Sequence, residues 1–197
     1  MIEPAIILAI ESAIRGGSIA LARGVDVLDS GIGEGGVSRA EDLLWNIDEM
    51  LKRNNFAKHE LSQIAVSVGP GSFTGIRIGL ATAMGLASAL NIELLKYSVL
   101  YAMASGQLDG ERITAVVPVG RSVSCKQTFR KNASEMVALT EPTPLADKTF
   151  EKVAKENALI SVDNFPRGLA TCLIDAANDS RVAIATDPLF IAKPSHI

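Results

Sequence analysis

Residues 69 to 79 read Gly-Pro-Gly-Ser-Phe-Thr-Gly-Ile-Arg-Ile-Gly, and this glycine-rich stretch is the strongest indication of the fold. The residues before it, 64 to 68, are apolar except for one serine, which predicts a short buried strand. Residues 76 to 90 contain good helix formers and no proline, which predicts a helix. The stretch is therefore predicted to turn the chain from a buried strand into a helix.

The spacing of the glycines does not fit the common nucleotide-binding loops. A Walker loop has four residues between its glycines and then Gly-Lys-Ser/Thr, whereas five residues separate Gly69 from Gly75. The dinucleotide fingerprint has two residues between its second and third glycines, whereas three residues separate Gly71 from Gly75. Bare amides at a helix start can still hold an anion, so nucleotide binding stays open. Spacing alone favours a tight strand-to-helix turn in which Ser72 or Thr74 caps the helix.

The complete string is more specific than its glycines. It resembles the hallmark of the TsaB family of tRNA threonylcarbamoyladenosine biosynthesis proteins, in the glycoprotease-like branch of the actin/sugar-kinase/Hsp70 superfamily. Residues 6–12 and 17–21 are similar to the opening hairpin of this family, which is usually written ILAIDTS and SVAL. Ser38-Arg39 and residues 43–51 resemble the segment after the His-Ser pair of the family. The resemblance is good to about residue 104 and weaker beyond it.

Two residues depart from the family pattern. Glu11 stands where the family usually has Asp, and Val37 stands where it usually has His. In kinases and ATPases of the superfamily, the acid at the end of the first strand holds Mg²⁺. The corresponding place in the second half of this chain, residues 117–121, has no carboxylate. Phosphoryl transfer depends on positioned metal and charge, so a structural role is favoured for Glu11 over a magnesium ligand.

Composition sets limits on the partners. The chain has 197 residues, enough to bury roughly 70% of its unfolded surface, and 48% of them are hydrophobic. A net charge of −3 provides no electrostatic footprint for nucleic acid, so tRNA is expected to be contacted only indirectly.

The apolar run 5–10 follows no basic residue and is too short for a signal peptide. No stretch approaches the ~20 apolar residues of a membrane span, so we expect a cytoplasmic protein.

The first lobe, residues 1–104, reads as three strands, a helix, a strand and a helix. In the first helix, residues 39–54, one apolar stripe contains Leu43, Leu44, Ile47 and Leu51. Trp45 lies off that stripe among charged residues. It is either half-exposed against a loop or a contact to a partner, since Trp is enriched at interface hot spots.

The second helix, residues 76–90, has Arg77 as its only charge. Small residues recur every four positions along it, at Gly75, Gly79, Ala83 and Ala87, which forms a smooth ridge. In so small a lobe one side of this helix has no obvious cover, which suggests a protein partner. We therefore expect Gly79→Leu to damage assembly more than folding.

The second lobe, residues 105–197, is smaller. Strands are expected at 113–119, 122–130, 135–139, 158–162 and 181–185, with helices at 145–157 and 168–178. Hairpins followed by alternating strands and helices, in two consecutive halves, resemble duplicated actin-like lobes. The predicted fold is α/β and two-lobed, actin-like and ribonuclease H-like, with mixed sheets and a reduced second lobe.

Side chains for catalysis are sparse. The chain has two histidines, His59 and His196, and two cysteines, Cys125 and Cys172, all scattered singly, so no metal site or disulfide framework is expected. A serine triad would need one of those histidines. Ser72 is the best candidate nucleophile, but a helix-capping serine is far more common. We expect no catalytic residue, cofactor or metal.

The family resemblance implies a function. It implies a non-catalytic scaffold that binds the catalytic subunit TsaD, cooperates with the ATPase subunit TsaE, and forms a homodimer when alone. The implied interface is on the first two helices, and we expect it to include Leu43, Leu44, Trp45, Ile47, Leu51, Gly79 and Ala83. A second set is expected to shape the glycine loop: Gly69, Gly71, Ser72, Thr74, Gly75 and Arg77. The alternatives are an ATP-dependent phosphotransferase or ATPase and, less favoured, a glycoprotease-type peptidase.

Overall fold

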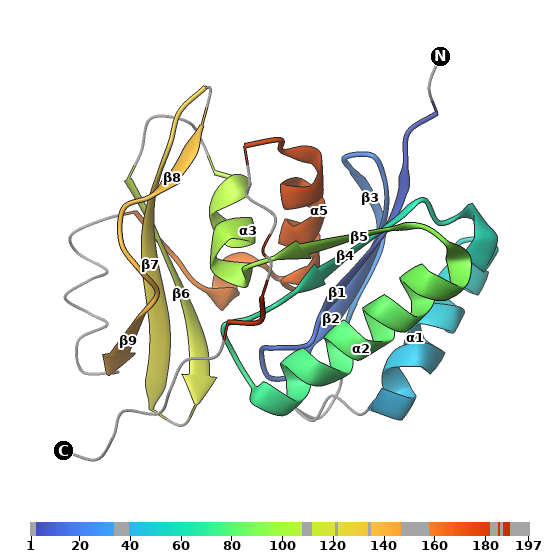
Figure 1. The fold of residues 1–197 in the computed structure, drawn as a ribbon, viewed down its shortest axis with the longest axis horizontal. Helices are drawn as coiled ribbons and strands as arrows, with labels where there is room; N and C mark the ends of the chain where they lie inside the picture. The colour runs from blue at the N-terminus through green and yellow to red at the C-terminus, as the bar shows by residue number, and fades with distance from the viewer. Residues whose placement is uncertain are drawn as a thin grey trace.

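A computed structural model describes residues 3–33, 40–107, 112–120, 122–133, 135–146, 158–181, 185 and 187–189. Its described elements form four layers (Figure 1): a sheet of strands β6 to β10, a pair of helices, a sheet of strands β1 to β5 and a second pair of helices, with five strands in each sheet. The two sheets are those expected of two lobes. The α/β, two-lobed actin-like class predicted from the sequence is therefore confirmed, with a mixed first sheet.

The first sheet has the strand order β3-β2-β1-β4-β5. Strands β1 to β3 pair antiparallel, whereas β4 and β5 run parallel to β1. The bounds are β1 (Ile6–Glu11), β2 (Ser18–Arg23), β3 (Asp26–Ile32), β4 (Gln63–Ser67) and β5 (Glu93–Tyr97). The central strand β1 is buried on both faces, which explains why residues 6–10 are all apolar.

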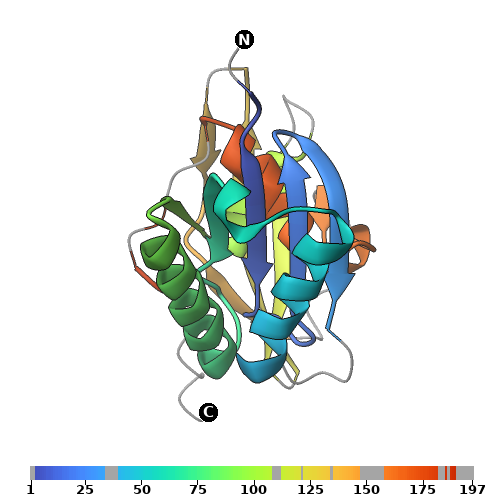
Figure 2. The same ribbon diagram turned by 90° about the vertical axis from the view of Figure 1, so that its right-hand side faces the viewer.

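The two faces of β1 serve different cores. Leu8 and Ile10 pack with α1 (Ala40–Arg53) and α2 (Phe73–Leu90). Ile7 and Ala9 belong to a core with α3 (Val99–Ser105), α5 (Ala170–Asn178) and residues of the second sheet. This division follows from the period of two along a strand. Figure 2 shows α1 and α2 side by side over the outer face of the first sheet.

The second sheet has the order β10-β6-β7-β8, with β9 also paired to β7. Its strands are β6 (Arg112–Gly120), β7 (Val123–Lys131), β8 (Met136–Ala138), β9 (Thr143–Ala146) and β10 (Ala158–Ile160). Two short 3-10 helices, η2 (Lys58–Glu60) and η3 (Val162–Asn164), join elements. Because α3 packs in a core shared with both sheets, the lobe boundary after residue 104 stays a prediction.

Several predicted elements need correction. Strand β5 and helix α3 were not predicted, because β5 is short and the seven residues of α3 show no amphipathic period. The helix predicted from residue 145 is wrong at its start, because Leu145 lies in strand β9, paired with β7. The rest of that helix, and most of the strand predicted at 181–185, lie outside the described residues.

Helix α2 begins three residues earlier than predicted, at Phe73, and has 18 residues. By length and composition alone it now qualifies as a membrane span, so the sequence argument that it is too short is wrong. Its position explains its composition instead. Gly75, Ile76, Gly79, Ala83 and Ala87 are buried, and Ala83 and Ala87 belong to the core beneath α1 and α2.

The small-residue ridge therefore packs inward, and the prediction that it forms a partner interface is wrong for Gly79 and Ala83. A Cβ on Gly79 would lie 2.0 Å from Ser12 Oγ on the β1–β2 connection. The close approach that the ridge permits is between α2 and the protein's own first hairpin. Leu43, Ile47 and Leu51 of α1 are likewise buried in this core, because the apolar stripe of an amphipathic helix covers the sheet beneath it.

We expect Gly79→Leu to damage folding rather than assembly. Its side chain would overlap the buried Ser12, so the free energy of unfolding should fall by about 3 kcal/mol or more. Gly85→Leu is the matched control, since Gly85 lies on the same helix and a Cβ added to it would meet no atom within 4 Å. It should gain about 1 kcal/mol from losing a mid-helix glycine. Urea unfolding measures both values, and equal effects would contradict the inward packing of the ridge.

Candidate docking site

The glycine-rich loop rests directly on the backbone of the β1–β2 connection. The Ser72 amide donates to the carbonyl of Ala13 at 2.6 Å, and Ser12 Oγ donates to the carbonyl of Gly75 at 2.8 Å. A Cβ on Gly71 would lie 2.3 Å from the Ala13 carbonyl oxygen, and one on Gly75 would lie 2.0 Å from that of Ser12. These two positions need glycine because backbone packs on backbone there.

Ser72 caps α2, and Thr74 lies exposed in its first turn. The Gly75 amide donates to Ser72 Oγ at 3.2 Å. The Gly69 amide donates to Ser67 Oγ, also at 3.2 Å, so three amides of this loop have partners within the protein. This arrangement favours a strand-to-helix turn over an anion cradle. Arg77 points outward, with its guanidinium carbon 3.7 Å from the Phe73 ring centroid.

Glu11 supports the other side of the same junction. Its side chain is buried, and Oε1 accepts hydrogen bonds from the amides of Ala13 at 2.7 Å and Ile14 at 3.0 Å. Burial raises the pKa of Glu11 to about 7, although both hydrogen bonds favour the ionised form. Glu11 thus fixes the residues on which the glycine loop rests.

The space between the two sheets is filled by side chains and helices. The Ala170 amide at the start of α5 donates to Ser18 Oγ at 2.9 Å. Gly168, with φ +92°, approaches Ser18 so closely that a Cβ would lie 2.6 Å from the serine Cβ. Tyr101 of α3 meets Phe129 of β7 edge to face, with 4.6 Å between ring centroids. One continuous core therefore spans both sheets.

Neither cysteine nor histidine provides a reactive centre in the described part of the chain. Burial raises the pKa of Cys125 to about 11 and that of Cys172 well above its usual range, so both thiols stay protonated. His59 is exposed in η2, and His196 lies outside the described residues. No group of three potential metal-ligating side chains occurs among the described residues.

The outer surfaces of α1 and α2 carry large exposed apolar side chains. Four of them are 49% exposed or more: Leu44 (51%), Trp45 (64%), Phe73 (49%) and Met84 (54%). We call this surface the α1–α2 face. Of the seven interface residues predicted from the sequence, Leu44 and Trp45 lie on it. Phe73 and Met84 were missed, although α2 exposes the side opposite its small-residue ridge, as the helical period requires.

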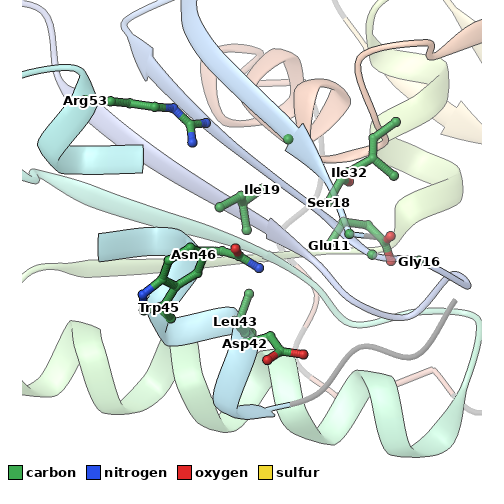
Figure 3. Close-up of a pocket in the computed structure, with 13 residues that line it drawn as sticks. Glu11, Gly16, Ser18, Ile19, Ile32, Asp42, Leu43, Trp45, Asn46 and Arg53 are labelled. Carbon is green, nitrogen blue, oxygen red and sulfur yellow. The ribbon is translucent and has the colours of Figure 1, made fainter. Parts of the chain in front are cut away.

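A groove of about 510 Å³ adjoins the α1–α2 face. Figure 3 shows it between α1, which contributes Asp42, Trp45 and Asn46, and the strands that carry Glu11 and Ile32. The remaining lining residues are Gly16, Gly17, Ser18, Ile19, Gly31, Gly33, Leu43 and Arg53. Trp45 belongs to both the face and the groove, so the two surfaces are continuous.

The comparison with known families identifies the chain. A family model described as TsaD, tRNA N6-adenosine threonylcarbamoyltransferase, matches residues 37–178. The chain belongs to this family. The match includes α1, the glycine loop and α2, and it runs through the second sheet to the end of α5.

Curated relatives are TsaB proteins. The tRNA threonylcarbamoyladenosine biosynthesis protein TsaB of Buchnera aphidicola subsp. Baizongia pistaciae is 38% identical over 78 residues, which cover 39% of this chain and 35% of the relative. TsaB of Escherichia coli is 34% identical over 64 residues, covering 32% and 28%. The chain thus matches about a third of the length of these relatives. The resemblance to TsaB predicted from the glycine-rich stretch is confirmed.

Solved structures support the TsaB-like fold over more of the chain. YeaZ from Pseudomonas aeruginosa aligns with a TM-score of 0.68 at 21% identity, covering 88% of this chain and 91% of the other. A second Pseudomonas aeruginosa protein, described as similar to peptidase YEAZ, aligns with a TM-score of 0.61 at 26% identity, covering 72% and 67%. The weakly matched second lobe therefore keeps the YeaZ fold.

We expect Glu11→Gln to flatten the pH dependence of stability. The Glu11 pKa rises from 4.5 to about 7 on folding, so the folded protein binds this proton more tightly than the unfolded chain. This stability is full below about pH 4.5 and is lost as the pH rises through about 7. One pKa unit corresponds to about 1.4 kcal/mol, so the wild type should lose roughly 3 kcal/mol more than the variant.

Urea unfolding of both proteins at several pH values between about 5 and 8 gives this difference. The remaining titratable groups are shared, so subtracting the two curves isolates Glu11. Parallel curves would show that folding does not raise the pKa of Glu11, and would contradict its burial.

Proposed function

We propose that this protein is a non-catalytic subunit of the tRNA threonylcarbamoyladenosine machinery, and that its α1–α2 face binds a TsaD-type catalytic subunit. The exposed apolar surface of α1 and α2 is the observation that carries the proposal. Trp45, Phe73 and Met84 give it the aromatic and methionine content typical of interface centres. The names of the TsaB relatives supply the pathway.

The chemistry of the face favours a protein over an RNA. Arg77 is the only charged side chain of α2, and the whole chain has a net charge of −3. RNA binding needs clustered cations for the phosphates, and stacking aromatics alone give little affinity. We therefore assign tRNA contact to the partner. Two helices on each side are enough for a specific interface of about 1,200–2,000 Å².

We extend the proposal to the protein without its partner. In the absence of a TsaD-type partner, two copies cover their α1–α2 faces in a homodimer, and TsaD displaces one copy. A TsaE-type ATPase joins the assembly through the catalytic subunit. The protein acts in the cytoplasm, where tRNA is modified.

A non-catalytic role agrees with the geometry between the sheets. Glu11 uses Oε1 to hold two backbone amides, and α5 occupies the space beside the first hairpin. At the corresponding turn of the second sheet, residues 117–120 are Val-Pro-Val-Gly and offer no carboxylate. Phosphoryl transfer would need that charge for its metal.

We expect Met84→Asp to abolish or strongly weaken association. A charge within an apolar interface must be desolvated on binding, which should cost at least tenfold in affinity, or about 1.4 kcal/mol. Val25→Asp is the matched control, because Val25 is even more exposed, at 68%, but lies on the β2–β3 turn. Analytical ultracentrifugation measures the homodimer, and calorimetric titration with TsaD measures the complex.

If the wild type neither self-associates nor binds TsaD, the proposed function is wrong. If Val25→Asp weakens binding as much as Met84→Asp does, the interface lies elsewhere on the protein.

The phosphotransferase and peptidase alternatives have their own test. We expect the purified protein to hydrolyse neither ATP nor peptides, because the described part of the chain assembles no metal site or triad. The measurement is phosphate release with Mg²⁺ present, compared between wild type and Glu11→Ala. Turnover of about 1 per second or more that Glu11→Ala removes would overturn the scaffold assignment.

A further inference from the structure

The groove beside α1 is lined by Glu11, whose carboxylate has one oxygen without a hydrogen-bond partner among the described residues. Oε1 of Glu11 accepts both amides of the hairpin, whereas Oε2 accepts no hydrogen bond from any residue that the structure describes. The Glu11 side chain is 2% exposed, yet it lines the groove (Figure 3). A buried charge normally has a partner, because leaving it uncompensated is costly. The open oxygen therefore points to a ligand.

The other charged groups of the groove define which ligand fits. Asp42 adds a second carboxylate, and the Trp45 indole adds an aromatic surface that attracts cations. Arg53 also lines the groove, but its Nε donates to Asp29 Oδ2 at 2.5 Å, and this hydrogen bond lowers the pKa of Asp29. The groove thus offers two carboxylates and an indole. Arg53, the cation in its lining, is paired with Asp29, which lies outside the lining.

We propose that this groove binds an arginine or lysine side chain of the protein that docks on the α1–α2 face. The inference rests on the proposed function and names a specific contact within it. Trp45 joins the face to the groove, so a partner seated on the face can extend a long side chain past the indole toward Glu11. The apolar stem would lie along Ile19, Ile32 and Leu43, and the cationic end would meet the carboxylates.

Other ligands fit the groove less well. A phosphate or carboxylate ligand would be repelled by Glu11 and Asp42. A hard metal ion such as Ca²⁺ needs six or more oxygen ligands, and the side chains of the described groove offer two carboxylates, the Asn46 amide and the Ser18 hydroxyl. A side-chain cation needs only one or two acceptors and gains from the indole.

The first experiment uses the single tryptophan of the chain, Trp45, as the reporter. N-acetyl-arginine amide is titrated into the wild type, with N-acetyl-citrulline amide as the neutral probe of the same shape. We expect saturable emission changes with arginine in about the millimolar range and none with citrulline. Glu11→Gln should weaken arginine binding about tenfold. Asp48→Asn, on α1 but outside the groove lining, should have no effect.

The second experiment uses the complex. Glu11→Gln should lower the affinity for TsaD about tenfold, mostly through faster dissociation, whereas Asp48→Asn should not. If Met84→Asp abolishes binding but Glu11→Gln leaves it unchanged, the groove contact is wrong and the proposed function stands. If citrulline binds as well as arginine, the groove is not a cation site. If the wild type binds no TsaD and forms no dimer, the proposed function itself fails.

Discussion

The contact between the glycine-rich loop and the β1–β2 connection anchors the whole fold. Gly71 and Gly75 approach the backbone of Ser12 and Ala13 more closely than any side chain would permit. Ser72 then both caps α2 and donates its amide to Ala13, so the direction of α2 is fixed relative to the central strand. Glu11 holds the same connection from inside through two amides. Backbone packing of this kind leaves α2 little freedom to rotate.

The orientation of α2 determines which surface remains for a partner. Because Gly75, Gly79 and Ala83 face the hairpin and the sheet, the opposite side of α2 exposes Phe73 and Met84. Leu44 and Trp45 of α1 are exposed as well. A helix that is apolar all round normally has cover on all sides. Here the fold covers one side, and the other side suits a protein partner.

The interior of the protein joins the two sheets. Helices α3 and α5 fill the space between the sheets with one continuous apolar core. Ser18, which begins β2 and also lines the groove, accepts a hydrogen bond from the Ala170 amide at the start of α5. Burial also keeps the Cys172 thiol protonated within this core. The open groove lies beside α1, next to the exposed helices. Its carboxylates, Glu11 and Asp42, therefore lie near the exposed apolar side chain of Trp45.

Local signals in the chain were enough to predict the family, the strands β1 and β4, and the helices α1 and α2, because glycine spacing and apolar period are read over a few residues. They also led to the expectation that the chain has no metal site and no serine triad, because its two histidines are far apart in the sequence. They did not establish which side of each helix is buried, since the ridge of α2 and the stripe of α1 suit a partner as well as a sheet. For that reason the sequence analysis predicted a partner interface that included Leu43, Ile47 and Gly79. Only the folded structure showed that these residues are buried. The packing of α2 against Ser12 joins residues more than 60 positions apart in the chain, which local sequence patterns do not report.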